Sequence, residues 1–193
     1  MARTKDFNEE EVLDKALAIF WQKGYNGTSM QDLVEELGIS RSSMYDTYTD
    51  KYSLFLKSLE KYRKQTAGAL LQMINEAESP KAVIKKILQL VVDESLLGKE
   101  PRGCFMVNTC VENAPHDKAV AKIIHDNLQD YEEAFCQAIK KGQAMGEITS
   151  RNDAKALARF IINTINGIRV AARSGADKAV YDDIVKVALS VLE

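Results

Sequence analysis

Apolar residues recur every three or four positions along most of the chain, and this spacing constrains the fold more than any other feature. Such a repeat is typical of amphipathic helices, whereas no segment shows the sustained alternation of apolar and polar residues that predicts a strand. The prolines are Pro80, Pro101 and Pro115, and each one suits a helix boundary. The pattern therefore predicts an all-α protein.

Capping residues and breaks divide this pattern into successive helices. Asn8 is a suitable N-cap for the first helix, and Thr28 opens a Thr-x-x-Gln capping box before the second. Ser40 can cap the third helix, and Thr49 or Asp50 can cap the fourth. The expected helices cover residues 8–24, 28–38, 40–47, 50–77, 80–97, 103–113, 117–145, 152–174 and 177–192.

The composition changes near residue 50, and we divide the chain there. Residues 1–50 hold three expected helices, and the last two are joined by a turn at Gly38. Two short helices with a sharp turn between them are the geometry of a helix-turn-helix. Residues 51–193 hold longer helices, and the 46% of apolar residues is enough for a packed core. We therefore expect a three-helix, helix-turn-helix head on a larger helical-bundle body.

The charge balance excludes a strongly basic protein. Lys and Arg number 26 and Asp and Glu number 28, so the formal net charge is −2. A protein that binds nucleic acid through its bulk charge is usually basic. Any binding of DNA must therefore come from a local arrangement of side chains.

The rest of the composition argues against several other classes. The three cysteines form no CxxC pair and there are only two histidines, so we expect no disulfide scaffold, no metal site and no cofactor. No apolar run approaches the ~20 residues of a membrane span, and the start of the chain lacks the apolar stretch of a signal peptide. A cytoplasmic protein is expected. Without a phosphate-binding loop or a hydrolase motif, an enzyme is not expected.

Residues 39–51, ISRSSMYDTYTDK, combine small hydroxyls with a cation where the third helix begins. A helix that enters a DNA groove needs short side chains and hydrogen-bond donors on its outer face. Ser40, Ser42 and Ser43 supply small donors, and Arg41 can reach a phosphate or the acceptors of guanine. The alternative is that the serines are ordinary helix caps.

Aromatic and cationic residues flank these hydroxyls. Tyr45 and Tyr48 can each donate a phenolic hydrogen bond to phosphate, although Tyr45 can equally be half core. Lys51 falls in the first turn of the fourth helix, where free backbone N–H groups attract anions and an ammonium would strengthen a phosphate clamp.

Residues 24–55, GYNGTSMQDLVEELGISRSSMYDTYTDKYSLF, closely resemble the N-terminal signature of TetR/AcrR-type transcriptional repressors. The matching positions are Gly24, Tyr25, Thr28, Ser29, Gly38, Ile39, Ser40, Tyr45, Tyr48, Lys51 and Leu54. The resemblance implies a DNA-binding head and an all-helical domain that binds an effector and dimerises. Asp46 departs from the family pattern, and this leaves the operator sequence open.

Residue chemistry and the resemblance together select the candidate DNA contacts. Arg3 precedes the first helix and resembles a basic arm that enters a minor groove, or else it is a solvated terminus. The candidates are Arg3, Thr28, Ser29, Ser40, Arg41, Ser42, Ser43, Tyr45, Tyr48 and Lys51.

The last two expected helices are apolar beyond a single stripe. Residues 177–192 carry Val180, Ile184, Val187 and Val191 on one side, and further apolar residues widen the arc. Such helices need partners on two sides, which indicates a four-helix interface between two subunits, with full burial in a monomer as the alternative. The interface candidates are Ile161, Ile165, Ile168, Tyr181, Ile184, Val185 and Ala188.

An effector pocket is indicated by the soft, apolar segment PRGCFMVNTCVENAP, because Met adapts to irregular shapes. The lining candidates are Leu88, Val91, Cys104, Phe105, Met106 and Cys110, and the expected effector is small and apolar or aromatic. Plain core packing is the alternative for each residue.

The sequence therefore predicts a ligand-responsive repressor that binds a palindromic or pseudo-palindromic operator as a homodimer. One alternative is a regulator of the same fold that senses oxidants or electrophiles through Cys104, which follows Gly103 at a helix start and lies near Arg102. A second alternative is an all-helical binding protein without affinity for DNA.

Overall fold

The structure is a computed structural model that describes residues 7–97 and 102–193. Within these ranges every element of secondary structure is a helix, which confirms the all-α prediction. The helices are α1 (Glu9–Gly27), α2 (Met30–Leu37), α3 (Arg41–Tyr48), α4 (Lys51–Glu76), α5 (Pro80–Leu96), α6 (Phe105–Glu112), α7 (Lys118–Ala144), α8 (Ala154–Arg173) and α9 (Lys178–Ser190). The N-caps predicted at Asn8, Ser40 and Asp50 are confirmed, because each side chain accepts a backbone hydrogen bond from the first turn.

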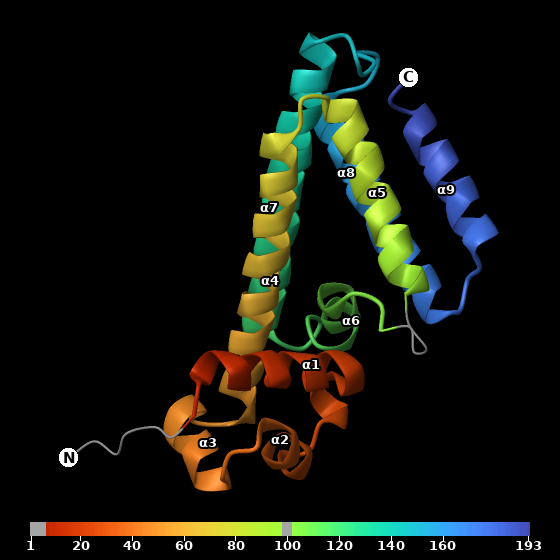
Figure 1. Ribbon diagram of the computed structural model, residues 1–193. Coiled ribbons are helices and arrows are strands. Elements are labelled where there is room, and N and C mark those ends of the chain that lie inside the picture. The colour runs from red at the N-terminus through yellow and green to blue at the C-terminus, as the bar shows by residue number, and fades with distance from the viewer. Residues whose placement is uncertain (1–6, 98–101) are drawn as a thin grey trace.

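The described helices form a small head at one end of a longer body (Figure 1). Helix α1 lies across the end of the body, with α2 and α3 on its far side. Helix α4 leaves the head and runs along α7, and α5 and α8 form a second pair. Helix α9 packs on α5 and α8 at the outer edge, and α6 lies against α1 where the head meets the body.

The apolar core forms two clusters, and one of them contains residues from both sides of the predicted domain boundary at residue 50. The body cluster joins α5, α7, α8 and α9 around fully buried side chains such as Leu88, Phe135 and Ile161. The other cluster includes Phe20 and Met44 in the head and continues into α4, α6 and the start of α7. Apolar packing shared across residue 50 therefore holds the head against the body.

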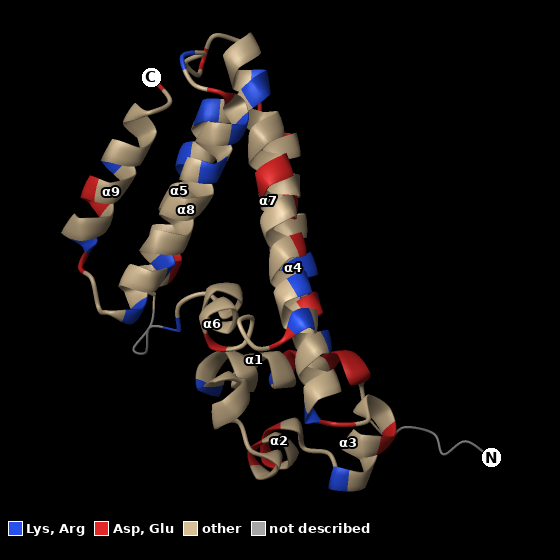
Figure 2. Cartoon of the chain, turned by 180° about the vertical axis from the view of Figure 1, so that it is seen from behind, with Lys and Arg blue, Asp and Glu red and all other residues tan. Residues whose placement is uncertain are grey.

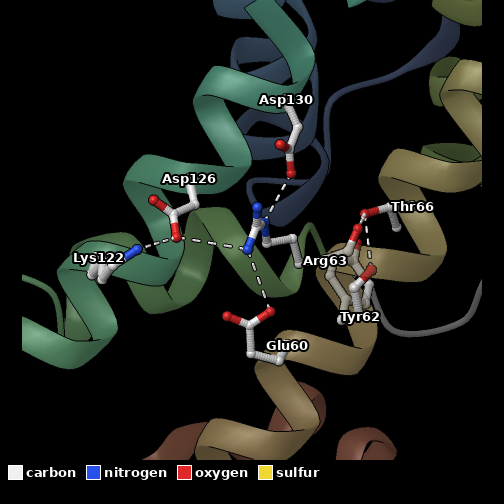
Figure 3. A network of polar contacts seen from close by, with 7 residues as sticks. All are labelled: Glu60, Tyr62, Arg63, Thr66, Lys122, Asp126 and Asp130. Atoms are coloured by element: carbon white, nitrogen blue, oxygen red, sulfur yellow. Dashed lines mark hydrogen bonds and ion pairs between the residues drawn. The ribbon is translucent and has the colours of Figure 1, made fainter.

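A network of ion pairs joins α4 to α7 (Figure 3). Nε of Arg63 on α4 lies 2.9 Å from a carboxylate oxygen of Asp130, and its Nη1 lies 3.7 Å from one of Asp126. Oε2 of Glu60 lies 3.4 Å from the same Nη1, and Nζ of Lys122 lies 2.6 Å from Oδ2 of Asp126. The Arg63 side chain is 20% exposed, so water screens these contacts less than an isolated surface pair. The network therefore helps to fix how the helix that leaves the head runs along the body.

The passage from α1 to α2 differs from the prediction. The predicted box of Thr28 and Gln31 is wrong, because the Thr28 hydroxyl donates to the carbonyl of Gly24 at 2.7 Å. Ser29 is the N-cap instead: its Oγ accepts from the N–H of Asp32 at 3.0 Å, and the Asp32 carboxylate accepts from the N–H of Ser29 at 2.8 Å. The backbone leaves the helical conformation at Gly24, with φ 73° and ψ 170°. This kink turns Thr28 inward and shifts the cap by one residue.

Candidate functional site

The turn between α2 and α3 has helix-turn-helix geometry. Gly38 follows α2 in the left-handed conformation, with φ 66° and ψ 25°, and its N–H donates to the carbonyl of Val34. Glycine adopts this conformation without a steric cost. Ile39 then turns into the core with 8% of its surface exposed, and Ser40 starts α3. The left-handed glycine and the buried isoleucine thus set the angle between the two helices.

Helix α3 has one anchored face and one open face. Met44 is fully buried and Tyr48 is 3% exposed, and these residues, one turn apart, hold α3 against the head. Arg41, Ser42 and Tyr45 are exposed on the other side. A helix that is packed along one side and presents polar side chains along the other has the form needed to read a DNA groove.

The serines at the start of α3 form a hydroxyl cluster. Oγ of Ser40 lies 2.9 Å from Oγ of both Ser42 and Ser43, and it accepts from the N–H of Ser43 at 3.1 Å. The capping alternative is therefore confirmed for Ser40. A serine hydroxyl has one donor and two acceptor positions, so the cluster keeps capacity for further hydrogen bonds at the exposed start of α3.

Two residues predicted to contact DNA are buried instead. The hydroxyl of Tyr48 donates to the carbonyl of Glu9 at 3.2 Å, which ties α3 to α1. Burial, with a smaller effect of the Glu9 carboxylate, raises the pKa of Tyr48, so the phenol stays a neutral donor. Thr28 is 1% exposed and its hydroxyl is bonded to Gly24. The assignment of both residues to the DNA surface is corrected, because their donors are used inside the fold.

The start of α4 already holds a carboxylate. Asp50 accepts from the N–H of Ser53 at 2.6 Å, and this hydrogen bond lowers the pKa of Asp50. The ammonium of Lys51 lies 4.3 Å from the centre of the Tyr25 ring, a cation–π contact, and burial lowers its pKa. A phosphate at this helix end would therefore meet a lysine that is partly drawn into the fold and a neighbouring anion.

Three further residues bear on the candidate DNA surface of the head. Ser29 is exposed, but its hydroxyl donates to Asp32 at 2.7 Å. Arg3 lies outside the described residues. Lys57, which the sequence analysis did not select, is exposed beside α3, with its ammonium 5.3 Å from the centre of the Tyr48 ring. Its position depends on the angle between α3 and α4, for which the sequence carries no signal.

Charges of both signs are mixed over the molecule, as the near-neutral balance predicts. In Figure 2 basic and acidic segments alternate along the body helices, and acidic segments lie on α2. A basic segment lies on α3, whose one cation is Arg41. Within the described residues, α3 therefore offers a polyanion the single guanidinium of Arg41.

Most residues predicted for a subunit interface lie in the core of the single chain. Those buried between α5, α8 and α9 are Ile161, Ile165, Ile168, Tyr181, Val185 and Ala188, and Ile184 is half-buried against the same cluster. The six buried side chains are covered by their own chain and offer little surface to a second subunit, whereas Ile184 stays an interface prediction. For those six residues the structure favours the alternative of internal packing.

The other apolar side of the same helices is exposed. On α9, Val180 is 45% exposed and Val187 is 63% exposed. They are spaced seven positions apart, which is about two turns of helix, so both lie on one face. On α8, Phe160 is 43% exposed and Val170 is 54% exposed. Apolar surface is thus left uncovered on both C-terminal helices.

The residues predicted to line an effector pocket are divided between different parts of the fold. Leu88 and Val91 belong to the body cluster. Phe105 packs in the head cluster, with its ring 6.0 Å from that of Phe55, and Cys110 is exposed. The structure therefore does not gather these four predicted residues in one cluster, and their part in an effector pocket stays a prediction.

A small cavity does lie inside the body, between α4, α6, α7 and α8. Its volume is about 20 Å³, and Cys104 and Met106 of the predicted set line it. Polar groups from other helices meet them there, among them Tyr62, Asn127, Tyr131 and Arg169. The cavity is therefore more polar than the apolar segment around Cys104 predicts.

Other kinds of site find no support in the described part of the chain. Among residues 7–97 and 102–193, no group of His, Cys, Asp and Glu is arranged to hold a metal ion. Within the same ranges no helix is long and apolar enough to cross a bilayer. The cysteines are free thiols, with Cys104 buried, Cys136 half-buried and Cys110 exposed.

A groove-reading helix on a small head, carried by a helical body with an internal cavity, defines a helix-turn-helix transcriptional regulator. Residues 12–57 match the family described as bacterial regulatory proteins, tetR family. Residues 81–188 match the tetracyclin repressor-like C-terminal domain. The chain belongs to the TetR family of bacterial transcriptional regulators, which confirms the resemblance inferred from residues 24–55.

The similarity to known proteins extends over nearly the whole chain. The chain is 33% identical over 194 residues to the HTH-type transcriptional regulator YezE of Bacillus subtilis (strain 168), with all of both chains covered. It is 32% identical over 175 residues to the HTH-type transcriptional repressor ComR of Escherichia coli (strain K12), which covers 90% of this chain and 83% of ComR. A solved complex of a cysteine mutant of the TetR-family regulator CifR with 26-base-pair operator DNA has a TM-score of 0.86 and 25% identity, over 99% of this chain and 100% of CifR.

Proposed function

We propose that this regulator is a homodimeric repressor that binds a palindromic or pseudo-palindromic operator and is released by a small effector. One observation carries the proposal: α3 is packed through Met44 and exposes Arg41, Ser42 and Tyr45. The similarity to ComR, which is named a repressor, supports the direction of control. Acting on DNA, the protein would work in the cytoplasm, by binding and not by catalysis.

The proposed DNA contacts divide into two kinds. Arg41, Ser42 and Ser43 face the groove, where a guanidinium can bond guanine or phosphate and hydroxyls can bond either. Tyr45 and Lys57 flank them and would contact the sugar–phosphate backbone, which positions the helix without reading sequence.

The exposed apolar residues of α8 and α9 support a dimer. Phe160, Val180 and Val187 are large apolar side chains with 43%, 45% and 63% of their surface exposed. Pairing the same two helices of a second copy about a two-fold axis would cover such a surface. Two heads on one dimer would then read the two half-sites of an operator.

The contacts of α6 support a route from the body cavity to the head. The indole N–H of Trp21 on α1 donates to the carbonyl of Gly103 at 3.2 Å, and Gly103 precedes Cys104, which lines the cavity. At the other end of α6, the carboxylate of Glu112 accepts from the N–H of Asn26 at 3.2 Å. An effector that moves α6 would therefore move α1 and change the distance between the two heads. Release requires that the effector prefers one arrangement over the other.

A gel-shift assay with the DNA upstream of the protein's own gene tests the proposal. Arg41→Ala and Tyr45→Ala should each weaken operator binding by about 5- to 150-fold, as expected when a base or backbone contact is lost. The matched control is Lys64→Ala, which removes one exposed positive charge from α4 outside the head. If both head variants retard the operator DNA as strongly as the wild type does, α3 is excluded as the reading helix. If the wild type retards no DNA specifically, the alternative of a binding protein without DNA affinity is favoured.

A second candidate function is thiol-based sensing through Cys104. It is favoured by the position of Sγ, 3.1 Å from Nη1 of Arg169, because a neighbouring cation favours a reactive thiol. Only 3% of Cys104 is exposed, which disfavours direct attack by a reagent. Under this alternative, hydrogen peroxide should release the operator from the wild type and not from Cys104→Ser, and an equal response of the two proteins would exclude it.

A further inference from the structure

A positive charge lies largely buried in the body, and no buried carboxylate pairs with it within residues 7–97 and 102–193. The Arg169 side chain on α8 is 16% exposed and lines the cavity between α4, α6, α7 and α8. In the described part of the chain it pairs with the carboxylate of Glu94, which is 3.9 Å away, and the Glu94 side chain is 68% exposed. An exposed carboxylate at that distance is screened by water and balances a largely buried guanidinium only weakly.

The other contacts of Arg169 also leave room for an anion. Its Nη1 donates to Sγ of Cys104 at 3.1 Å, and a thiol sulfur is a weak acceptor. Burial by itself lowers the pKa of Arg169, but the net shift is upward, away from neutral pH. The guanidinium therefore stays charged. Among the described residues its N–H donors meet the Cys104 sulfur, the Tyr131 phenol and the exposed Glu94 carboxylate, and none of these is a buried anion.

Neutral donors and an unused acceptor surround this charge. Burial raises the pKa of Tyr62 and of Tyr131, so both phenols in the cavity wall stay protonated. Asn127 on α7 is 9% exposed, lines the same cavity, and its Oδ1 accepts no hydrogen bond. A buried polar atom without a partner is rare in folded proteins, so the cavity has room beside Asn127 for a water molecule or another hydrogen-bond donor.

The rest of the wall is apolar and reaches the surface. Met106, Leu128 and Ile162 line the cavity, and Leu128 is 42% exposed, so the cavity lies next to solvent on this side. A volume of about 20 Å³ holds roughly one water molecule, and a larger guest would need the wall to yield. The flexible side chain of Met106 is suited to this. Any displacement of α6 by the guest would also act on Gly103, which is bonded to Trp21 of the head.

We propose that the effector of this regulator is a small carboxylic acid with a short apolar tail. The carboxylate would bind the guanidinium of Arg169 and accept from the neighbouring phenols, and the tail would lie along Met106, Leu128 and Ile162. This inference names the effector class and rests on the proposed function for its regulatory consequence. Binding of the acid itself does not depend on DNA.

Thermal unfolding of the full chain tests the inference with acids and their uncharged amides. The probes are acetate, butyrate and benzoate, each compared with acetamide, butyramide and benzamide at an ionic strength matched with sodium chloride. The acids should raise the melting temperature as their concentration increases, because a ligand that binds the folded state stabilises it. The amides, which keep the shape and lack the charge, should have little effect.

Two variants locate the binding. Arg169→Gln should weaken acid binding by about tenfold to a hundredfold, the expected loss for hydrogen bonds to a charged group. Glu94→Gln removes the exposed carboxylate beside Arg169 and should retain or strengthen acid binding. Circular dichroism checks that both variants are folded, and Asn127→Ala serves as a second lining variant that keeps the buried charge.

The results separate this inference from the proposed function. Stabilisation by amides equal to that by acids, no stabilisation by any of the three acids, or full acid binding by a folded Arg169→Gln would overturn the effector class. Acid binding without specific retention of operator DNA would instead overturn the repressor function and leave the acid site in place. Acid binding that releases the operator supports both.

Discussion

Replacing Gly24 by Ala tests the joint between the head and α6. Gly24 has φ 73° and ψ 170°, a combination that residues with a Cβ adopt only under strain. A Cβ at this position would lie 2.7 Å from Oε2 of Glu112 on α6. The substitution therefore adds a backbone cost and a contact so short that the Glu112 side chain has to move.

The structure sets the size of the effect. Holding Ala in this conformation costs about 1–3 kcal/mol. Moving the Glu112 carboxylate gives up its hydrogen bonds from the N–H and the side-chain amide of Asn26, at 3.2 and 3.0 Å, and each contributes about 1 kcal/mol. We expect Gly24→Ala to lower the free energy of unfolding by about 3–5 kcal/mol, and the melting temperature by roughly 6–20 °C for a chain of this size.

Urea and thermal unfolding, followed by circular dichroism, measure this loss against two controls. Gly38 also has a positive φ, of 66°, but nothing described lies within 4 Å of an added Cβ. Gly38→Ala should therefore show the backbone cost alone, about 1–2 kcal/mol. Glu112→Ala removes the side chain that an added Cβ at position 24 would meet. The double substitution should therefore lower the free energy of unfolding by less than the sum of the two single substitutions.

The reasoning fails if Gly24→Ala lowers the free energy of unfolding no more than Gly38→Ala does, and if its effect is simply additive with that of Glu112→Ala. That outcome would mean that the joint relaxes freely around the new Cβ. It would also mean that the hydrogen bonds between Glu112 and Asn26 do not hold α6 to the head.

Two further predictions concern Tyr48 on α3 and the exposed apolar face of α9. Tyr48→Phe should leave operator affinity within about twofold of the wild type, while loss of the hydrogen bond to Glu9 should lower the free energy of unfolding by about 1 kcal/mol. Gel shift measures the affinity and urea unfolding measures the stability. An operator complex weakened tenfold would show that Tyr48 contacts DNA. Val187→Glu should convert the proposed dimer to a monomer in size-exclusion chromatography with light scattering, because it places a carboxylate on the exposed apolar face of α9. Lys186→Glu, a charge reversal off that face, should leave the mass unchanged, and an unaltered mass for Val187→Glu would exclude this face as the interface.

The helices and their order were predictable because they depend on neighbours along the chain. Apolar spacing defines a helix, and a side chain such as Asn8, Ser40 or Asp50 caps it from the adjacent residue. The cap of α2 was missed by one position. Thr28 and Ser29 have the same capping chemistry, and the kink at Gly24 decides between them.

The side of a helix that becomes buried was less predictable. Tyr45 and Tyr48 lie three residues apart on α3, and either could face outward by composition alone, but only Tyr48 meets α1. On α9 two apolar faces compete, and packing against α5 and α8 selects the one with Tyr181 and Val185. The interface prediction therefore named the buried face, whereas the exposed face carries Val180 and Val187.

The sequence alone was sufficient for the all-α class, the helix-turn-helix and the family, because these follow from local spacing, capping and a continuous motif. Only the tertiary structure decided which polar residues meet inside the body. Tyr62, Cys104, Asn127 and Arg169 lie on or next to four different helices and share one cavity. Burial and charge balance depend on neighbours in space, and those neighbours are set only when the helices pack against one another.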